Sequence, residues 1–68
     1  MRRRTAWLAE HPLCCMCREQ NTVALAQQVD HVVPLWRGGA DDESNMQSLC
    51  IMHHELKTAR EAKERSGA

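Results

Sequence analysis

Three cysteines and a histidine are spaced in two pairs that suit a metal ion. Each pair encloses two residues, and the four members are Cys14, Cys17, Cys50 and His53. Thiolate and imidazole pairs at this spacing place two ligands on one side of a tetrahedron, as in structural zinc sites. With Cys15, the four cysteines could instead form two disulfides in a small secreted protein. The N-terminal sequence MRRRTAWLAEHP has no apolar run of signal-peptide length, which favours a reducing cytosol and a structural Zn²⁺ ion.

His53 is followed directly by a second histidine, His54, in a segment with the composition of a helix start. Consecutive side chains on a helix diverge by about 100°, whereas positions i and i+4 share a face. The two imidazoles would therefore face different surroundings, and we expect them to have different roles.

A second set of polar residues has the types that phosphodiester hydrolysis needs. Its members are Asp30, His31, Asn45 and His54. Hydrolysis requires a base that activates water, and positive charge that stabilises the developing phosphorane and the leaving oxygen. A neutral imidazole suits the first task, and a divalent cation held by a few ligands with open positions suits the second.

Three segments in this order, VDHVVPLWRGG, NMQSLC and HHELKT, resemble the HNH endonuclease family, specifically its small phage-type members with a Cys-x2-Cys at each end of the motif. The resemblance covers roughly residues 7–63. It implies metal-dependent DNA cleavage that leaves 5′-phosphate and 3′-hydroxyl ends. It also implies that His31 is the general base and that Asp30 and His54 bind the catalytic metal. Asn45 would hold the His31 loop by amide hydrogen bonds, although in some relatives an asparagine reaches the metal directly.

His53 stands where this family more often has the last cysteine of its second Cys-x2-Cys. A histidine at this position keeps a Cys3His zinc site, while His54 would turn toward the catalytic metal. The oxygen and nitrogen ligands of Asp30 and His54 suit Mg²⁺ or Mn²⁺, and Ni²⁺ or Zn²⁺ could also occupy the site. Either histidine could compete for either metal.

Each of these residues also has a simpler structural interpretation. Asp30 could cap a turn, Asn45 could be the N-cap of a helical turn, and a helical histidine such as His54 is more often a surface residue than a ligand. Trp7 and Trp36, the two aromatic residues, could pack the small core, or a loop tryptophan could touch the minor groove. Two other functions also stay open: a non-catalytic zinc-knuckle DNA-binding module, and a zinc-stabilised domain that binds a protein such as a phage DNA-packaging terminase.

The formal net charge is zero, which by itself argues against nucleic-acid binding. The charges are unevenly distributed, however, because acidic residues gather at 41–43 while both ends carry basic groups. The expected DNA contacts are Arg2, Arg3, Arg4, Arg37 and Lys57. Each basic group taken alone could equally belong to a solvated face.

Sixty-eight residues form one domain at most, and a core of this size supplies about 3–5 kcal/mol, so a metal staple is expected. The composition predicts a helix at about 2–11, a zinc knuckle at 14–17, a hairpin or two short strands within 23–33, a loop at 37–45 and a helix at 52–65. The ββα core would then span about 23–65 of a single domain covering 1–68.

The sequence therefore predicts an α+β protein with a small ββα-metal (His-Me finger) fold, stapled by a structural zinc and preceded by a short N-terminal helix. Because neighbours in a strand point to opposite faces, we expect the strand to bend or end at Asp30 and His31, which must serve one site. No segment approaches the roughly 18 apolar residues of a membrane span. We therefore expect a protein of the phage or bacterial host cytosol, cytoplasmic and without a membrane partner, that acts on DNA as a monomer or weak dimer.

Overall fold

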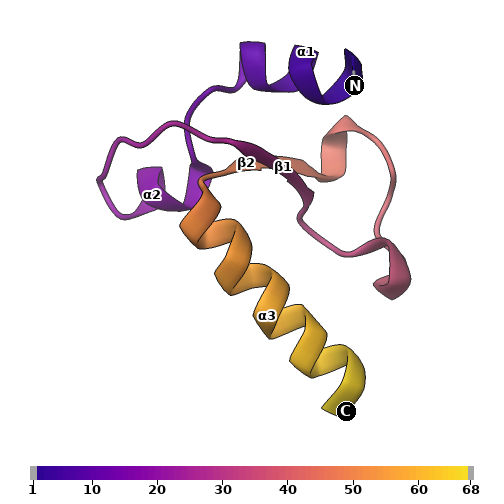
Figure 1. The fold of residues 1–68 in the computed structure, drawn as a ribbon. Helices are drawn as coiled ribbons and strands as arrows, with labels where there is room; N and C mark the ends of the chain where they lie inside the picture. The colour runs from indigo at the N-terminus through magenta and orange to yellow at the C-terminus, as the bar shows by residue number, and fades with distance from the viewer. Residues whose placement is uncertain (1, 68) are drawn as a thin grey trace.

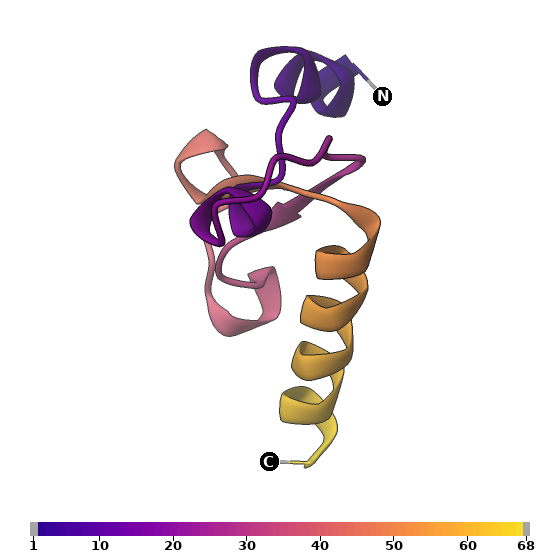
Figure 2. The same ribbon diagram turned by 90° about the vertical axis from the view of Figure 1, so that its left-hand side faces the viewer.

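The computed structural model describes residues 2–67, which fold into three α-helices around a two-stranded sheet. In chain order the helices and strands are α1 (Arg2–Glu10), α2 (Cys15–Glu19), β1 (Gln28–His31), β2 (Met46–Leu49) and α3 (Ile51–Gly67). Two short 3-10 turns, η1 (Leu35–Arg37) and η2 (Glu43–Asn45), lie in the loop between the strands. In both ribbon views α1 lies on one side of the sheet and α3 extends away on the other (Figures 1 and 2).

The sheet pairs β1 with β2 in antiparallel register, with His31 opposite Met46 and Gln28 opposite Leu49. β1 ends at His31, where the sequence predicts that the strand must bend or end. β2 leads through a single residue, Cys50, into α3. Two strands followed by a helix confirm the predicted α+β fold.

The prediction of a hairpin or two strands within residues 23–33 is wrong. Only Gln28–His31 form a strand there, and their partner β2 lies in a segment to which the sequence assigned no element. Leu25 makes one isolated bridge with Leu13 and is 69% exposed, so its apolar character is not used in a sheet. β2 has no β-branched residue, but pairing with β1 and burial of Ser48 and Leu49 favour the extended conformation.

The helices begin and end where local chemistry requires. α1 ends at Glu10, just before Pro12, and the His11 N–H still donates to the Trp7 carbonyl at 2.8 Å. α3 begins directly after Cys50, whose carbonyl accepts a hydrogen bond from the His54 N–H at 2.9 Å. The long helix α3 therefore begins within the predicted metal site.

The core is small and contains sulfur. Among the described residues, the buried apolar side chains are Cys14, Cys17 and Leu49. Trp7 docks α1 on the sheet, because its indole N–H donates to Ser48 Oγ at 2.9 Å. Trp36 is instead 45% exposed, so it does not pack the core.

Within residues 2–67, no helix combines the length and the apolar character that a membrane crossing would need.

Candidate metal centre and catalytic site

The two cysteine-containing pairs meet in one cluster. Cys14 and Cys17 come from the start of α2, whereas Cys50 and His53 come from the start of α3. Their ligand atoms all lie within 4.8 Å of one another. His53 Nδ1 lies 3.6, 3.4 and 3.2 Å from the sulfurs of Cys14, Cys17 and Cys50. All four cysteines of the chain are free thiols, so the cluster offers three sulfur donors and one nitrogen donor.

The electrostatics of this cluster suit a divalent cation. Burial raises the pKa of the Cys14 thiol, but hydrogen bonds from the backbone of Cys17 and Cys50 outweigh it and lower the pKa to about 6. Burial and hydrogen bonds with the Cys14 and Cys50 thiols raise the pKa of Cys17 to about 12. The two values differ because hydrogen bonds stabilise the Cys14 thiolate, whereas a second thiolate at the buried Cys17 would also be repelled by its neighbours. A dication removes that repulsion, so this soft, closed Cys3His donor set fits zinc.

Asp30, at the second-last position of β1, faces α3. Its Oδ2 atom is buried and lies 2.7 Å from the Nζ atom of Lys57. The Lys57 ammonium directs its hydrogen bonds to the His31 carbonyl at 2.8 Å and to the Glu61 carboxylate. Burial lowers the pKa of Lys57, but the two carboxylates outweigh burial and raise it. The buried Asp30 carboxylate is therefore paired with an ammonium, and a metal ion at this oxygen would take the place of that ammonium.

His31, the next residue, turns its ring to the other side. Its Nε2 atom lies 3.0 Å from Oδ1 of Asp41, in the loop between the strands. The ring helps to line a cavity of about 180 Å³ together with Arg3 and Arg4 of α1. Hydrogen bonding by His31 and the charge of Arg3 hold the pKa of the Asp41 carboxyl below its usual value.

Asn45 closes the loop that follows His31. Its side-chain amide donates to the carbonyls of Val33 and Ala40, each at 2.8 Å, and its Oδ1 atom accepts from the Val33 N–H at 2.9 Å. Gly39 allows this closure, because a Cβ there would lie 1.9 Å from the Val33 oxygen and 2.8 Å from Asn45 Nδ2. Asn45 ends the η2 turn rather than capping it. Its amide therefore acts on the backbone of the loop.

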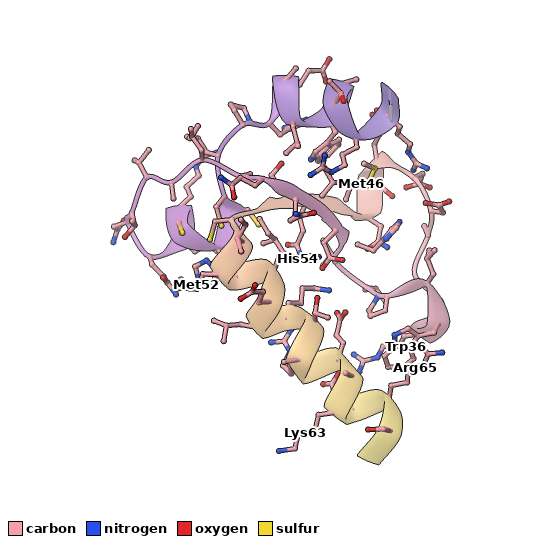
Figure 3. All side chains as sticks on the ribbon, in the orientation of Figure 1. Trp36, Met46, Met52, His54, Lys63 and Arg65 are labelled. Carbon is pink, nitrogen blue, oxygen red and sulfur yellow. The ribbon has the colours of Figure 1, made fainter. Side chains whose placement is uncertain are left out.

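His54 occupies the first turn of α3, one residue beyond the metal cluster (Figure 3). It is partly buried, and within residues 2–67 its ring makes no hydrogen bond. Positions 54 and 57 lie three apart on one helix face, and Lys57 contacts Asp30. His54 thus projects from the face of α3 that contacts the end of β1.

The predicted site residues are only partly brought together. The four expected zinc ligands form the single group of three or more Cys, His, Asp or Glu donors that the described residues place within reach of one ion. Asp30, His31 and His54 do not form a second such group, because Asp30 faces Lys57 and His31 faces Asp41.

The basic residues expected to contact DNA also differ in their placement. Lys57 is buried, with 4% of its side chain exposed, so the expected surface contact is replaced by internal ion pairs. Arg3 pairs with Asp41, Arg4 donates to the Gln27 carbonyl, and Arg37 pairs with Glu64 at 2.6 Å. Arg2 lies in α1, but its side chain lies outside the described residues.

Two acidic residues at the site were missed by the sequence analysis. Glu61 could have been found, because it lies four positions after Lys57 and such pairs share a helix face. Asp41 had no local signal, because it lies in a polar loop and meets His31 only through the fold.

Comparison with known proteins gives concordant results. A family model described as HNH endonuclease matches residues 14–60. Forty residues, 57% of this chain, are 50% identical to the human (Homo sapiens) protein named DNA annealing helicase and endonuclease ZRANB3, and the match to the mouse (Mus musculus) protein of the same name is 48% identical. The chain spans only 4% of the length of these curated relatives.

A solved structure matches over nearly the whole chain. It is the crystal structure of the HNH endonuclease of the deep-sea thermophilic bacteriophage GVE2 with manganese ion, at a TM-score of 0.73 and 40% sequence identity. The match covers 96% of this chain and 73% of the phage protein's chain. Because the family model spans more than half of the 68 residues, and the fold agrees, this chain belongs to the HNH endonuclease family.

Proposed function

We propose that this protein is a metal-dependent nuclease that hydrolyses DNA phosphodiester bonds. The observation that carries the proposal is the end of β1, where Asp30 contacts Lys57 on the helix that also carries His54, and the adjacent His31 extends toward Asp41. Membership of the HNH endonuclease family supports the same conclusion. The expected products carry 5′-phosphate and 3′-hydroxyl ends.

His31 is the general base in this proposal, taking a proton from the attacking water. Its backbone is held by Lys57, which donates to the His31 carbonyl, and the loop behind it is held by Asn45. Asp30 and His54 would hold the catalytic ion, Mg²⁺ or Mn²⁺ by preference, with Ni²⁺ or Zn²⁺ as alternatives. When bound, that ion supplies positive charge for the phosphate and the leaving oxygen.

The Asp30 carboxylate already holds one cation, the Lys57 ammonium, at its buried Oδ2 atom, which supports a cation site at this position. With Asp30 and His54 as its protein ligands, a divalent ion there would leave its other coordination positions for water and phosphate. Lys57 now lies where it neutralises Asp30, so an entering ion would compete with the ammonium for this carboxylate. Glu61, which also contacts Lys57, offers the ammonium an alternative partner.

A separate, structural Zn²⁺ ion is proposed for Cys14, Cys17, Cys50 and His53. It would join α2 to the start of α3 and so fix the position of His54 in the first turn of that helix. The proposed DNA contacts are Arg2, Arg3, Arg4 and Arg37. We propose that residues 1–68 form a single domain, which acts in the phage or host cytosol as a monomer or weak dimer.

The test is nicking of supercoiled plasmid with Mg²⁺ or Mn²⁺, with and without EDTA. His54→Ala should keep the fold and zinc content while cleavage falls by orders of magnitude. His31→Ala should lose cleavage but still bind the divalent ion, because a general base need not coordinate it. His53→Ala should lower zinc content and stability, and lose activity as a consequence. His11→Ala is the matched control and should nick normally.

One observation favours a second function, a zinc-knuckle module that binds DNA without cleaving it: Lys57 already neutralises Asp30. DNA binding without nicking under any divalent ion would support that function. Nuclease-resistant capture of a phage terminase would support a protein-interaction role instead. Normal nicking by both His31→Ala and His54→Ala would refute the nuclease proposal.

A further inference from the structure

A carboxylate outside the expected site contacts the proposed base. Asp41 Oδ1 lies 3.0 Å from His31 Nε2, and the same oxygen accepts a hydrogen bond from Arg3 at 3.3 Å. The Arg3 guanidinium also donates to the Asp41 backbone carbonyl at 3.0 Å. The three residues come from β1, the loop between the strands and α1, so the contact joins three parts of the fold.

Asp41 is held in place although 58% of its side chain is exposed. Asn45 fixes the preceding residue by donating to the Ala40 carbonyl. The following residue, Asp42, caps the η2 turn by accepting from the Ser44 N–H at 2.9 Å. The Asp41 carboxylate therefore extends from a backbone that is fixed on both sides, with Arg3 directing it.

The chemical consequence concerns which nitrogen of His31 carries the proton. An ionised carboxylate only accepts hydrogen bonds, so the Nε2 atom of a neutral His31 must be the donor. The lone pair then resides on Nδ1, which makes no hydrogen bond within the described residues and is free to take a proton from water. A base oriented through its second ring nitrogen is a general catalytic arrangement.

We propose that Asp41 is a positioning residue that fixes the tautomer and the ring orientation of His31, and that Arg3 holds Asp41 in place for this purpose. The inference rests on the proposed role of His31 as general base. Stability alone gives little reason for the contact, because ion pairs this exposed add little to folding. Its effect should therefore appear in the catalytic step.

The first test does not depend on cleavage. A long-range ¹H–¹⁵N correlation spectrum of the zinc-loaded protein, at about pH 8 where histidine is neutral, reports the protonated ring nitrogen. We expect the His31 Nε2–H proton to be protected from exchange with solvent, and Asp41→Ala to abolish that protection. A proton on Nδ1 in the wild type, or unchanged exchange in the variant, would overturn the proposal.

The second test separates positioning from substrate binding. Asp41→Ala should lower kcat by about 10- to 100-fold, the usual cost of losing an orienting partner, with KM within about twofold. Asp41→Glu should recover part of the rate. Glu43→Gln removes a negative charge from the same loop and should have no effect. A rise in KM alone, or equal effects of Asp41→Ala and Glu43→Gln, would refute the assignment. A wild type that never cleaves DNA would refute the nuclease proposal, and the exchange experiment would still decide the role of Asp41.

Discussion

Removing zinc should unfold this protein, because little else in the described residues can keep it folded. Leu49 is the one fully buried large aliphatic side chain among those that the structure describes, and its burial contributes about 1.5–3 kcal/mol. An isolated two-stranded sheet is marginal in water, and each ordered residue costs about 1–2 kcal/mol of backbone entropy. Zinc binding to small domains is worth about 10–16 kcal/mol, several times the contribution of Leu49.

The assay is thermal unfolding of a Trp36→Leu variant followed by Trp7 fluorescence, with and without a strong zinc chelator. Trp7 reports tertiary structure, because its indole bonds Ser48 and stacks on His11 with ring centroids 4.0 Å apart. We expect chelation to abolish the cooperative transition and added Zn²⁺ to restore it. Far-ultraviolet circular dichroism alone is less decisive, because α3 can retain some helix by itself.

Two cysteines, one inside the cluster and one outside it, provide a matched pair of variants. Cys50→Ser removes a cluster sulfur and should reduce bound zinc and the Tm together. Cys15→Ser alters a thiol outside the cluster that donates to Gln47 Oε1 at 3.3 Å, a bond that a hydroxyl can also make. It should keep one zinc per chain and a nearly unchanged Tm. A chelated wild type that kept its cooperative transition would refute the reasoning.

Three further predictions follow from the loop, the basic residues and the buried lysine. Gly39→Ala should lower the Tm by at least about 4 °C, because its Cβ would collide with the Val33 oxygen; an unchanged Tm would contradict the loop geometry. Arg4→Ala and Arg37→Ala should each weaken binding to all DNA sequences alike and reduce the slope of log affinity against log salt by up to about one, measured by fluorescence anisotropy. The raised pKa of Lys57 means that its ion pairs stabilise the fold below pH 10.5 and are lost as the pH rises through the higher folded-state pKa. Urea unfolding should therefore show the advantage of wild type over Lys57→Met shrinking above that pH, and a constant difference would argue against the ion pairs.

Short-range spacing allowed the Cys3His cluster to be predicted from the sequence. Two ligands separated by two residues can meet one ion whatever the rest of the fold does, and the start of α3 after Cys50 then brings the pairs together. The Ala-, Glu- and Lys-rich composition likewise predicts α3, because local propensity and the lack of an interrupting proline agree.

Features decided by tertiary contacts could not be predicted in the same way. Residues 46–49 have weak strand propensity and become β2 only through pairing with β1. A lysine in a polar helix such as α3 is usually exposed, and only the proximity of Asp30 explains why Lys57 is buried. The contact between Asp41 and His31 depends on a loop closed by Asn45, so sequence spacing alone gives no sign of it.

The position of the cluster ligands also determines when the chain can fold during its synthesis. Cys14 and Cys17 belong to the first third of the chain, whereas Cys50 and His53 are made only after both strands. A nascent chain that has not yet emerged as far as His53 would hold half of the proposed zinc site and almost no apolar core, so we expect it not to complete its folding. We therefore expect zinc availability at the ribosome exit to govern the yield of folded protein, with shortage exposing the nascent polypeptide to proteases.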